Sequence, residues 1–489
     1  MNKNITLVFP SFLSNAFGSK WRKNSSIVYP VGLFYIAAAL ERQGYSVRVI
    51  DFNVDKYERE EFDEIVRSSD MVGISVYTRS YRNAQGLCSY IRKVNPGALI
   101  IAGGPHINLM RELFPGTDLI LVGEGEEVIG EVVTALFNGD YERLQGFPGL
   151  IFRKNGEIVN TGTFLQVSNL DTDIYPARQL IDRSKYGELI DINVTDRIDS
   201  VVTSRGCPYS CTFCIRKCVF SYRVRSPEHV VDEIEQLSKS GTQILVFNED
   251  NFLVDRERAI KIMDGIVERG IKVRILIQAR VDVVDDELYS ALRRGGVFLI
   301  LYGIESANQD ILDFYDKRTT VEQAERAIRT AKRYGIFTYG FFILGAPMER
   351  EEHIRRSIQF VLENPLDFIA LNILDYQYGS RLWKQAHKEG LVKDNQLIVT
   401  TNSRFGSLDT ATLEEFSKEM YRAFYLRPSL FARIFAKSLR ARNFILLKFT
   451  FKLLMKILFN FRVFSFISHD NPETIECEKS HITDAEEMC

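Results

Sequence analysis

The chain has 489 residues, of which 45% are hydrophobic and 26% charged, and its formal net charge is −2. This is the composition of an ordinary globular protein, and the length suggests about three domains and a sizeable core. The balanced charge gives no overall attraction to nucleic acid, so we expect no nucleic-acid partner. Seven cysteines, three of them in one short loop, do not resemble a disulfide framework.

The first 145 residues read as alternating strands and helices. Short apolar runs predict strands at residues 5–9, 46–51, 71–76, 98–103 and 119–122. Helices are expected between them, including one at residues 32–42 that ends near Gly44 and one at residues 83–94. This alternation predicts a parallel, doubly wound sheet.

Ligands of such sheets bind outside the carboxyl ends of the strands. The loops at those ends are Ser75-Val-Tyr-Thr78, Gly103-Gly-Pro-His106 and Gly123-Glu-Gly-Glu126, whose glycines let a bulky ligand approach the backbone. No G-x-G-x-x-G motif follows the first strand, so a dinucleotide site is not expected. A domain that only packs remains the alternative. The candidate ligand-binding residues of this domain are Ser75, Thr78, Gly103, Gly104, Gly123, Glu124, Gly125 and Glu126.

Residues 146–199 are interpreted as a connector between two domains. Two short apolar runs flank Lys154-Asn-Gly156, a favourable two-residue hairpin turn.

Three cysteines, Cys207, Cys211 and Cys214, follow an apolar run with the spacing C-x3-C-x2-C. Three thiolates in one tight loop can hold three irons of a 4Fe–4S cluster and leave the fourth iron open to a small molecule. The alternatives are a zinc knuckle or scattered core cysteines, but zinc sites usually take four ligands in paired spacings, and no second pair follows. Cys218 lies four residues further on and is the one nearby thiol that could serve as a fourth ligand.

Residues 200–380 alternate again between strands and helices. Strands are expected at residues 200–204, 243–248, 272–279, 297–304, 337–344 and 367–374. Helices are expected near residues 227–239, 256–268, 285–294, 321–334 and 350–363. Six strand–helix units are fewer than the eight of a closed barrel and predict a partial barrel.

Polar residues gather after the predicted strands of this second region. A single charged residue such as Glu305 is usually a solvated loop residue or a salt-bridge partner. Its position after the fourth strand, downstream of the cysteine loop, favours a role in a site. The candidate residues are Asn248, Glu249, Asp250, Gln278, Arg280, Gly303, Glu305, Ser306 and Gly345.

The cysteine loop, placed after a first strand, resembles that of the radical S-adenosylmethionine (SAM) superfamily. In that family the open iron binds the amino and carboxylate groups of SAM. Upstream, Pro30-Val-Gly-Leu33 and the glycine loops at Gly103 and Gly123 resemble the cobalamin-binding domain that precedes some radical SAM domains. That family includes methyltransferases and the anaerobic protoporphyrin-ester cyclase, and the resemblance covers roughly residues 1–430.

The resemblance implies three cofactors: a 4Fe–4S cluster, SAM and cobalamin. The segment after the second strand would contact the SAM amino group, Glu305 and Ser306 the ribose, and the backbone around Gly345 the adenine. The cobalamin tail would enter beside Ser75 and Thr78. The D-x-H-x-x-G signature is absent, so we expect cobalt without a histidine ligand and His106 as a loop residue.

The implied activity is methylation of an unactivated carbon through a 5′-deoxyadenosyl radical and methylcobalamin. The substrate is a small molecule, a lipid or a peptide, and the electron donor a protein such as a flavodoxin or ferredoxin. Radical cyclisation, oxidation or rearrangement without methyl transfer is the alternative. A cobalamin or cluster sensor would need an output domain, which is not evident. A methylthiotransferase is disfavoured because Cys88 stands alone upstream.

The C-terminal region, residues 381–469, is expected to be helical. Between Tyr421 and His469 there are ten lysines and arginines and no acidic residue, and Lys448, Lys452 and Lys456 recur at helical spacing. This predicts a basic amphipathic helix that either lies on an anionic bilayer or packs on the barrel. Residues 470–489 are acidic and expected to be disordered. Because there is no secretory signal and the cluster needs reducing conditions, the protein is expected in the cytoplasm. If the basic helix lies on a bilayer, a peripheral membrane contact is expected as well.

Overall fold

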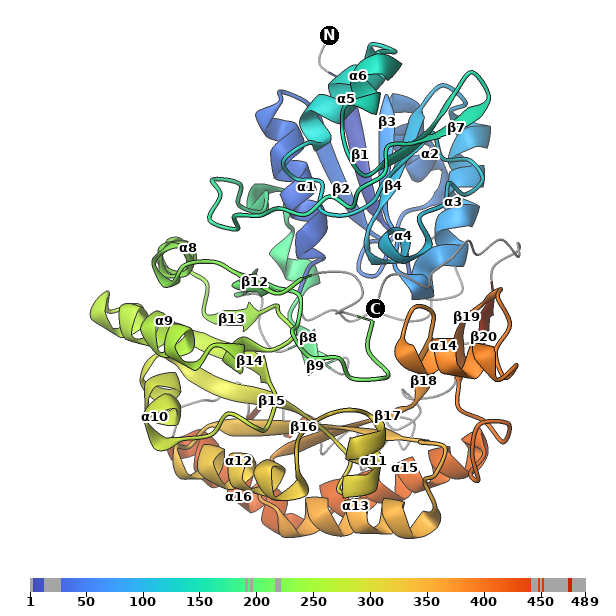
Figure 1. Cartoon of the computed structure of the whole chain (residues 1–489). Coiled ribbons are helices and arrows are strands. Elements are labelled where there is room, and N and C mark those ends of the chain that lie inside the picture. Colours follow the sequence, from blue (N-terminus) through green and yellow to red (C-terminus); the bar gives the residue numbers. More distant parts are fainter. Residues whose placement is uncertain are drawn as a thin grey trace. The chain divides into compact units, whose positions relative to one another are not determined.

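The computed structural model describes residues 3–12, 28–189, 192–193, 197–215, 221–440, 447–448, 451–452 and 474–476 (Figure 1). The chain divides into two compact units, Met1–Asp191 and Ile192–Cys489. Each unit is built on its own mainly parallel sheet.

The sheet of the first unit has seven strands in the order β2-β1-β3-β4-β5-β6-β7. The first five strands run parallel, as expected for a doubly wound sheet, and that expectation is confirmed. Their order places the topological switch between β1 and β3, where such sheets bind ligands. The strands are β1 (Asn4–Phe9), β2 (Ser46–Asp51), β3 (Met71–Ser75), β4 (Leu99–Gly103), β5 (Leu119–Leu121), β6 (Leu150–Lys154) and β7 (Glu157–Asn160).

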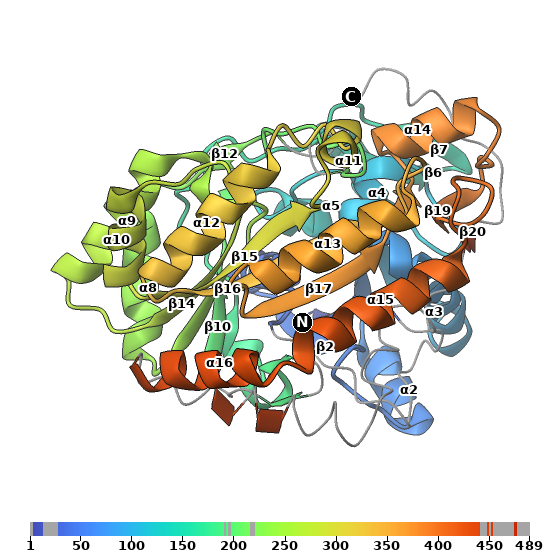
Figure 2. The same ribbon diagram turned by 90° about the horizontal axis from the view of Figure 1, so that it is seen from below.

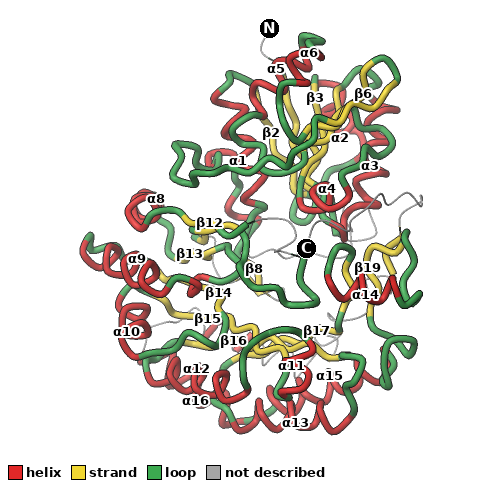
Figure 3. The backbone as a smooth tube through the Cα atoms, viewed as in Figure 1, coloured by secondary structure: helices red, strands yellow, loops and turns green. Residues whose placement is uncertain are grey.

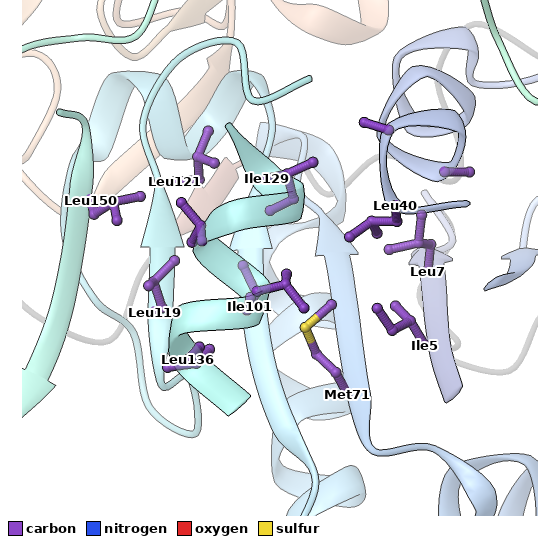
Figure 4. Close-up of a cluster of buried hydrophobic side chains, with 14 of the residues drawn as sticks. Ile5, Leu7, Leu40, Met71, Ile101, Leu119, Leu121, Ile129, Leu136 and Leu150 are labelled. Atoms are coloured by element: carbon purple, nitrogen blue, oxygen red, sulfur yellow. The ribbon is translucent and has the colours of Figure 1, made fainter. Parts of the chain in front are cut away.

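The helices of this unit pack their apolar faces on the sheet. Figure 4 shows Leu40 of α1 and Ile129 of α5 meeting side chains of the central strands, among them Leu7 and Ile101. All four side chains are buried, so this layer forms the core that holds the strand ends in place. The helices are α1 (Val31–Arg42), α2 (Arg59–Ser68), α3 (Tyr81–Val94), α4 (Pro105–Met110), α5 (Ile129–Phe137) and α6 (Tyr141–Gln145).

The predicted hairpin forms, and it is part of the first sheet. Asn155 and Gly156 both have positive φ angles, 52° and 87°, as a two-residue turn of the primed type requires. β6 then pairs antiparallel with β5, so the segment that the sequence analysis placed in a connector extends the sheet.

The sheet of the second unit has six parallel strands in the order β10-β13-β14-β15-β16-β17. The expected six-unit partial barrel is confirmed. Helices lie along one side of this sheet, red beside yellow in Figure 3, and Figure 2 looks onto α12 and α13 in front of the strands. The strands are β10 (Ile198–Val201), β13 (Ile244–Phe247), β14 (Arg274–Ala279), β15 (Val297–Glu305), β16 (Phe337–Leu344) and β17 (Phe368–Ile373).

The helices that follow these strands include one that the sequence analysis missed, α11 (Gln309–Phe314). The others agree with the expected ranges to within one residue at each end. They are α8 (Pro227–Lys239), α9 (Arg256–Glu268), α10 (Asp286–Arg294), α12 (Val321–Arg333) and α13 (Glu351–Glu363).

The C-terminal region covers the free edge of β17. Tyr425 of α15 (Thr410–Tyr425) accepts the backbone N–H of Ile369 at 3.0 Å and donates to its carbonyl at 3.1 Å. Tyr421 accepts the N–H of Leu371 at 2.9 Å. These hydroxyls satisfy backbone groups that an edge strand otherwise leaves open. This region also contains β18 (Asp375–Gln377), α14 (Arg381–Lys388), β19 (Gln396–Thr400) and α16 (Pro428–Arg440).

The acidic tail is not wholly irregular. Residues Thr474–Glu476 form β20, which pairs antiparallel with β19. For these three residues the expectation of disorder is wrong, because backbone pairing to an open strand edge does not depend on apolar content. The predicted basic helix falls mostly outside the described residues, which here are 447–448 and 451–452, all helical. Within the part of the chain that is described, no helix combines the length and apolarity needed to cross a membrane.

A buried carboxyl, Asp51, closes the end of β2. It accepts hydrogen bonds from the backbone and side-chain nitrogens of Asn53, at 2.9 and 3.0 Å, and from the Tyr186 hydroxyl at 3.2 Å. The neighbouring Asp55 pairs with Lys185. Burial raises the pKa of Asp51 to about 6. Since the folded state holds this proton more tightly than the unfolded chain, the resulting stabilisation is full below the unfolded pKa and is lost as the pH rises through about 6.

Replacing Asp51 by asparagine removes this titration. We expect the free energy of unfolding of the variant, relative to the wild type, to rise by on the order of 1 kcal/mol between pH 5 and pH 8. Urea unfolding at the two pH values measures the difference. The exposed Asp173→Asn is the matched control and should show no such change. A constant offset between Asp51→Asn and the wild type would contradict the prediction.

Candidate functional site

The three cysteines lie in an irregular loop that follows β10. The loop begins with a short strand, β11 (Ser204–Arg205), which pairs with β12 (Arg223–Val224), and reverses at Gly206, whose φ of +76° suits glycine. Cys207, Cys211 and Cys214 are half-buried, and the Cys214 N–H donates to the Cys211 carbonyl at 3.0 Å. All three thiols are therefore held in one turn-rich segment.

The far end of the loop is fixed by elements distant in sequence. Thr212 donates its backbone N–H to the carbonyl of Tyr315 at 2.9 Å and its hydroxyl to the carbonyl of Phe314 at 3.1 Å. Its own carbonyl accepts the N–H of Leu382, in α14, at 2.9 Å. The end of α11 and the start of α14 thus clamp the segment between Cys211 and Cys214. Nothing local in the sequence indicates these contacts.

The near end of the loop is fixed by a buried carboxylate. The oxygens of Glu249 accept the Thr203 hydroxyl at 2.8 and 2.9 Å and also the Ser204 hydroxyl. Arg258 of α9 donates to the Thr203 carbonyl at 2.7 Å. Burial raises the pKa of Glu249, and the hydroxyls and the Arg258 charge oppose that rise. Glu249, expected to contact SAM, thus has both oxygens engaged by hydroxyls of the chain.

A positive charge lies beside the cysteines. The Arg280 guanidinium is 3.9 Å from the Cys211 sulfur and stacks 3.8 Å from the centre of the Tyr209 ring. It also pairs with Asp282 at 3.1 Å. Burial raises the pKa of the Cys207 thiol, whereas Arg280 lowers it. A cation here favours the thiolates that a cluster needs, so the donor set fits an iron–sulfur cluster.

No three cysteine, histidine or carboxylate side chains among the described residues converge on one point, as the ligands of a single metal ion would. A 4Fe–4S cluster asks for a different arrangement, since each thiolate binds a separate iron. Cys218 lies outside the described residues.

The end of β15 carries a strained, buried ion pair. Glu305 has a φ of +67°, and the Ser306 N–H donates to the Ile304 carbonyl at 2.9 Å, which makes a tight three-residue turn. The Lys317 ammonium lies 2.7 Å from a Glu305 carboxylate oxygen, with both side chains buried. A Cβ at Gly303 would lie 2.6 Å from that oxygen. Such strain, on the order of 1–3 kcal/mol, typically persists where function requires it.

The other predicted residues of this unit lie at the same carboxyl edge of the sheet. Asn248 follows β13 and donates its N–H to the Val201 carbonyl at 2.9 Å, while Asp250 and Gln278 are half-buried. Gly345 follows β16 with a φ of +100° and donates its N–H to the buried Glu349. The structure therefore brings the predicted residues of four strands together, and adds Lys317 and Arg258, which no motif indicated.

In the first unit, two of the predicted glycines are needed by the chain itself. A Cβ at Gly104 would lie 2.8 Å from the backbone nitrogen of Val76, and one at Gly123 would lie 2.1 Å from the Leu165 carbonyl oxygen. Glu124 accepts the N–H of Val167 at 2.8 Å. Gly123 and Glu124 thus hold residues 165–167 against the end of β5. The sequence alone could not show whether these glycines make room for a ligand or for the chain's own backbone.

The strand-end surface of the first unit retains a smaller set of accessible candidates. Ser75, Gly103, Gly104 and Gly123 are half-buried, whereas Thr78, Glu124, Gly125 and Glu126 are buried. Small residues at this edge leave room for a large ligand to approach the backbone, so they fit a corrin or its nucleotide tail.

His106 is fully buried, and its contacts are with the chain itself. Its Nδ1 lies 3.2 Å from the Thr78 hydroxyl, and its ring is 4.4 Å from the Tyr81 ring. Burial lowers the pKa of His106 to about 3, which keeps the ring neutral. These contacts support the expectation of a structural histidine and leave Thr78 engaged with the chain.

Two family models match the chain: the B12 binding domain over residues 23–133 and the Radical SAM superfamily over residues 201–361. An uncharacterized methyltransferase of Pyrococcus horikoshii is 30% identical over 420 residues, which are 82% of this chain and 88% of that protein. The anaerobic magnesium-protoporphyrin IX monomethyl ester cyclase of Cereibacter sphaeroides is 30% identical over 418 residues, 82% of this chain and 68% of the cyclase.

The fold is also found among solved structures. The radical S-adenosylmethionine methyltransferase TsrM from Kitasatospora setae superposes with a TM-score of 0.62, covering 80% of this chain and 75% of that chain at 20% identity. At this identity the likeness concerns the fold.

Replacing any one of Cys207, Cys211 and Cys214 by alanine should remove most of the iron and abolish SAM cleavage, because a cluster held by two thiolates is not retained. Iron analysis and the visible absorption of anaerobically reconstituted protein measure the loss. Cys88→Ala is the matched control, since Cys88 is buried in the first unit, and it should keep the iron. Full iron and activity in Cys211→Ala would refute the assignment.

Proposed function

The chain belongs to the cobalamin-dependent radical SAM enzymes, and from this premise we propose that it methylates an unactivated carbon of a small-molecule, lipid or peptide substrate. When bound, the cluster and SAM supply a 5′-deoxyadenosyl radical, and cobalamin carries the methyl group. The observation that carries the proposal is one chain with both a cobalamin-type sheet and a three-cysteine loop on a partial barrel. The electron comes from a partner such as a flavodoxin or ferredoxin.

We assign the following roles to the residues of the chain. Cys207, Cys211 and Cys214 hold the cluster, with Arg280 beside them to favour the thiolates. Asp250 binds the SAM amino group, and Glu249 is engaged by the hydroxyls of the loop. Further roles are ribose binding by Glu305 and Ser306, adenine contact by the backbone at Gly345, and cobalamin contact by Ser75, Gly103 and Gly104.

Cyclisation without methyl transfer is the second candidate. It is favoured by one observation, the 30% identity to a cyclase over 418 residues. The two reactions share the cluster, SAM and the substrate radical, so the residues of the barrel do not separate them. The mass of the product does.

Glu305 has two roles that an experiment has to separate. Its carboxylate neutralises the buried ammonium of Lys317, and it lies at the strand end where SAM is expected. Removing one partner of a buried pair leaves an uncompensated charge and typically costs about 3–5 kcal/mol. A single substitution at Glu305 would therefore lower stability whether or not the residue binds SAM.

We also propose that the C-terminal region contacts an anionic membrane surface. The inner face of α16 is fixed to the barrel: Lys437 pairs with the buried Asp367 at 2.7 Å and donates to the Ile336 carbonyl at 2.7 Å. The outer face carries apolar side chains, with Phe435 and Leu439 50% and 46% exposed. Leu430 and Ile434 of α16 pack inward beside Lys437, and the helix also presents apolar side chains to the outside.

The chain beyond α16 contains further basic and aromatic residues. Lys448, Phe451 and Lys452 are helical and exposed, and no acidic residue occurs between Tyr421 and His469. A surface that combines exposed aromatic side chains with lysines and lacks carboxylates suits the interface of an anionic bilayer.

Anaerobic reconstitution with SAM, cobalamin and a reductant tests the activity. The protein should form 5′-deoxyadenosine and, with substrate, a product heavier by one methyl group, both read by mass spectrometry. A product without the methyl mass would select cyclisation or oxidation. If the protein binds its cofactors but forms no 5′-deoxyadenosine with any reductant, the assignment as an enzyme would be refuted.

Comparing Glu305→Gln, Lys317→Met and the double variant separates the two roles of Glu305. The double variant should recover most of the stability that each single variant loses, because no unpaired charge remains buried. If Glu305 binds SAM, the double variant should still bind SAM roughly ten- to a hundredfold more weakly, as expected for one lost charge-assisted hydrogen bond. Thermal unfolding and SAM titration measure the two quantities. Recovery of both would show that the pair is structural only.

The double variant Phe435→Ser/Leu439→Ser tests the membrane contact. Binding to phosphatidylglycerol vesicles should fall several-fold, and wild-type binding should weaken with salt. Val267→Ser, an exposed apolar residue of α9, is the matched control. Truncation after Arg440 should lower binding further and keep the fold, whereas a cut after Arg433 would remove Lys437, whose ammonium lies 2.7 Å from the buried Asp367. Full-length protein that ignores vesicles at low salt would contradict the proposal.

A further inference from the structure

The side chains on the two faces of the six-stranded sheet differ in how far they are buried. Side chains on the helix-covered face are fully buried, as Ile300 and Phe342 show at 0% exposure. On the opposite face, five residues of β15, β16 and β17 are half-buried and a sixth, Asn372, is exposed. We call these residues the open-face patch: Leu301, Tyr339, Phe341, Ile343, Ala370 and Asn372.

The strand register makes the patch continuous. Leu301 pairs with Tyr339, Phe341 with Ala370, and Ile343 with Asn372, and cross-strand partners share a face of the sheet. The Tyr339 and Phe341 rings lie 5.2 Å apart, and the Tyr339 ring stacks on that of Phe368 at 6.1 Å. An aromatic floor therefore spans two strands.

The patch adjoins the residues already assigned to SAM. Phe341 is the register partner of Gly303, two residues before Glu305. Open faces near the carboxyl ends of barrel strands are where substrates of such enzymes bind. SAM carries a cationic sulfonium and a charged amino acid group, which suit Asp250, Arg280 and Glu305 rather than this neutral surface.

The chemistry of the patch restricts what covers it. None of its six side chains is charged, and the exposed carboxamide of Asn372 has no hydrogen bond to the chain within the described residues. Burying a charged group here would leave the charge without a partner, which is costly. A carboxamide both donates and accepts, so it suits a hydroxyl, carbonyl or amide.

We propose that the open-face patch binds the substrate, and that the substrate presents a neutral, apolar ring system with one polar group within reach of Asn372. The ring system contacts both Tyr339 and Phe341. This inference rests on the proposed function, because it takes the cofactors to lie at the adjacent strand ends. An apolar substrate on this floor also excludes water from the place where a radical would form.

A matched pair of probes tests the chemistry on the full-length, reconstituted protein with SAM. The first probe is 2-naphthol, a neutral ring system with one hydroxyl, and the second is naphthalene-2-sulfonate, the same rings with a fixed charge. Equilibrium dialysis should show 2-naphthol binding at least tenfold more tightly. Unsubstituted naphthalene is the third probe and reports the rings alone.

Three variants locate the binding. Phe341→Ala should weaken 2-naphthol binding tenfold or more, and Asn372→Ala should weaken 2-naphthol several-fold while leaving naphthalene unchanged. Phe435→Ala, which removes an exposed aromatic ring on α16, should change neither. Ala370→Leu fills the patch without creating a cavity and should also block 2-naphthol, so the test survives if Phe341→Ala fails to fold. Iron content and circular dichroism report folding.

The outcomes separate this inference from the proposed function, because probe binding needs no turnover. Equal binding of the neutral and charged probes, or binding indifferent to both Phe341→Ala and Ala370→Leu, would overturn the inference even where 5′-deoxyadenosine forms. Loss of binding in Phe435→Ala alone would place the apolar site on α16 and overturn it as well. Failure of the cofactor chemistry with intact, patch-dependent binding would instead refute the methyl-transfer proposal.

Discussion

The contact between Glu249 and the hydroxyls of Thr203 and Ser204 is the constraint on which the cysteine loop depends. The loop has almost no regular structure, so its shape has to be imposed from outside. Glu249 does this from the end of β13, and Arg258 adds a bond to the backbone from α9. Because the carboxylate is buried, leaving either hydroxyl unpaired would cost free energy, and this penalty favours a single loop conformation.

One buried ion pair lies at each end of the barrel. Glu305 and Lys317 meet at the carboxyl ends of the strands, while Asp367 meets Lys437 just before β17 begins. Buried pairs seldom add much net stability, since desolvation offsets the attraction. Their effect is on geometry. The pair of Glu305 and Lys317 fixes a strained turn beside the cofactor residues, and the pair of Asp367 and Lys437 fixes the position of α16 at the amino-terminal end of β17.

Most strands and helices could be predicted because their signals are local. Short apolar runs located the strands, and the spacing of Cys207, Cys211 and Cys214 indicated the cluster. The failures share a different cause. α11, Lys317 and the clamp on Thr212 depend on contacts between segments far apart in the chain. The sequence also did not indicate that the chain's own backbone approaches Gly104 and Gly123. A glycine indicates that another group approaches the backbone closely, but the sequence does not show whether that group is a ligand or another part of the chain.

The tyrosine hydroxyls along β17 have a consequence for how the barrel is used. With the N–H groups of Ile369 and Leu371 and the Ile369 carbonyl already bonded to Tyr421 and Tyr425, a further strand has no backbone partners at this part of the edge. The arc of strands is thereby kept from closing toward an eight-stranded cylinder on this side. Because the barrel stays open on this side, it can admit molecules broader than a closed barrel could enclose. The same fold can therefore bind substrates of different sizes.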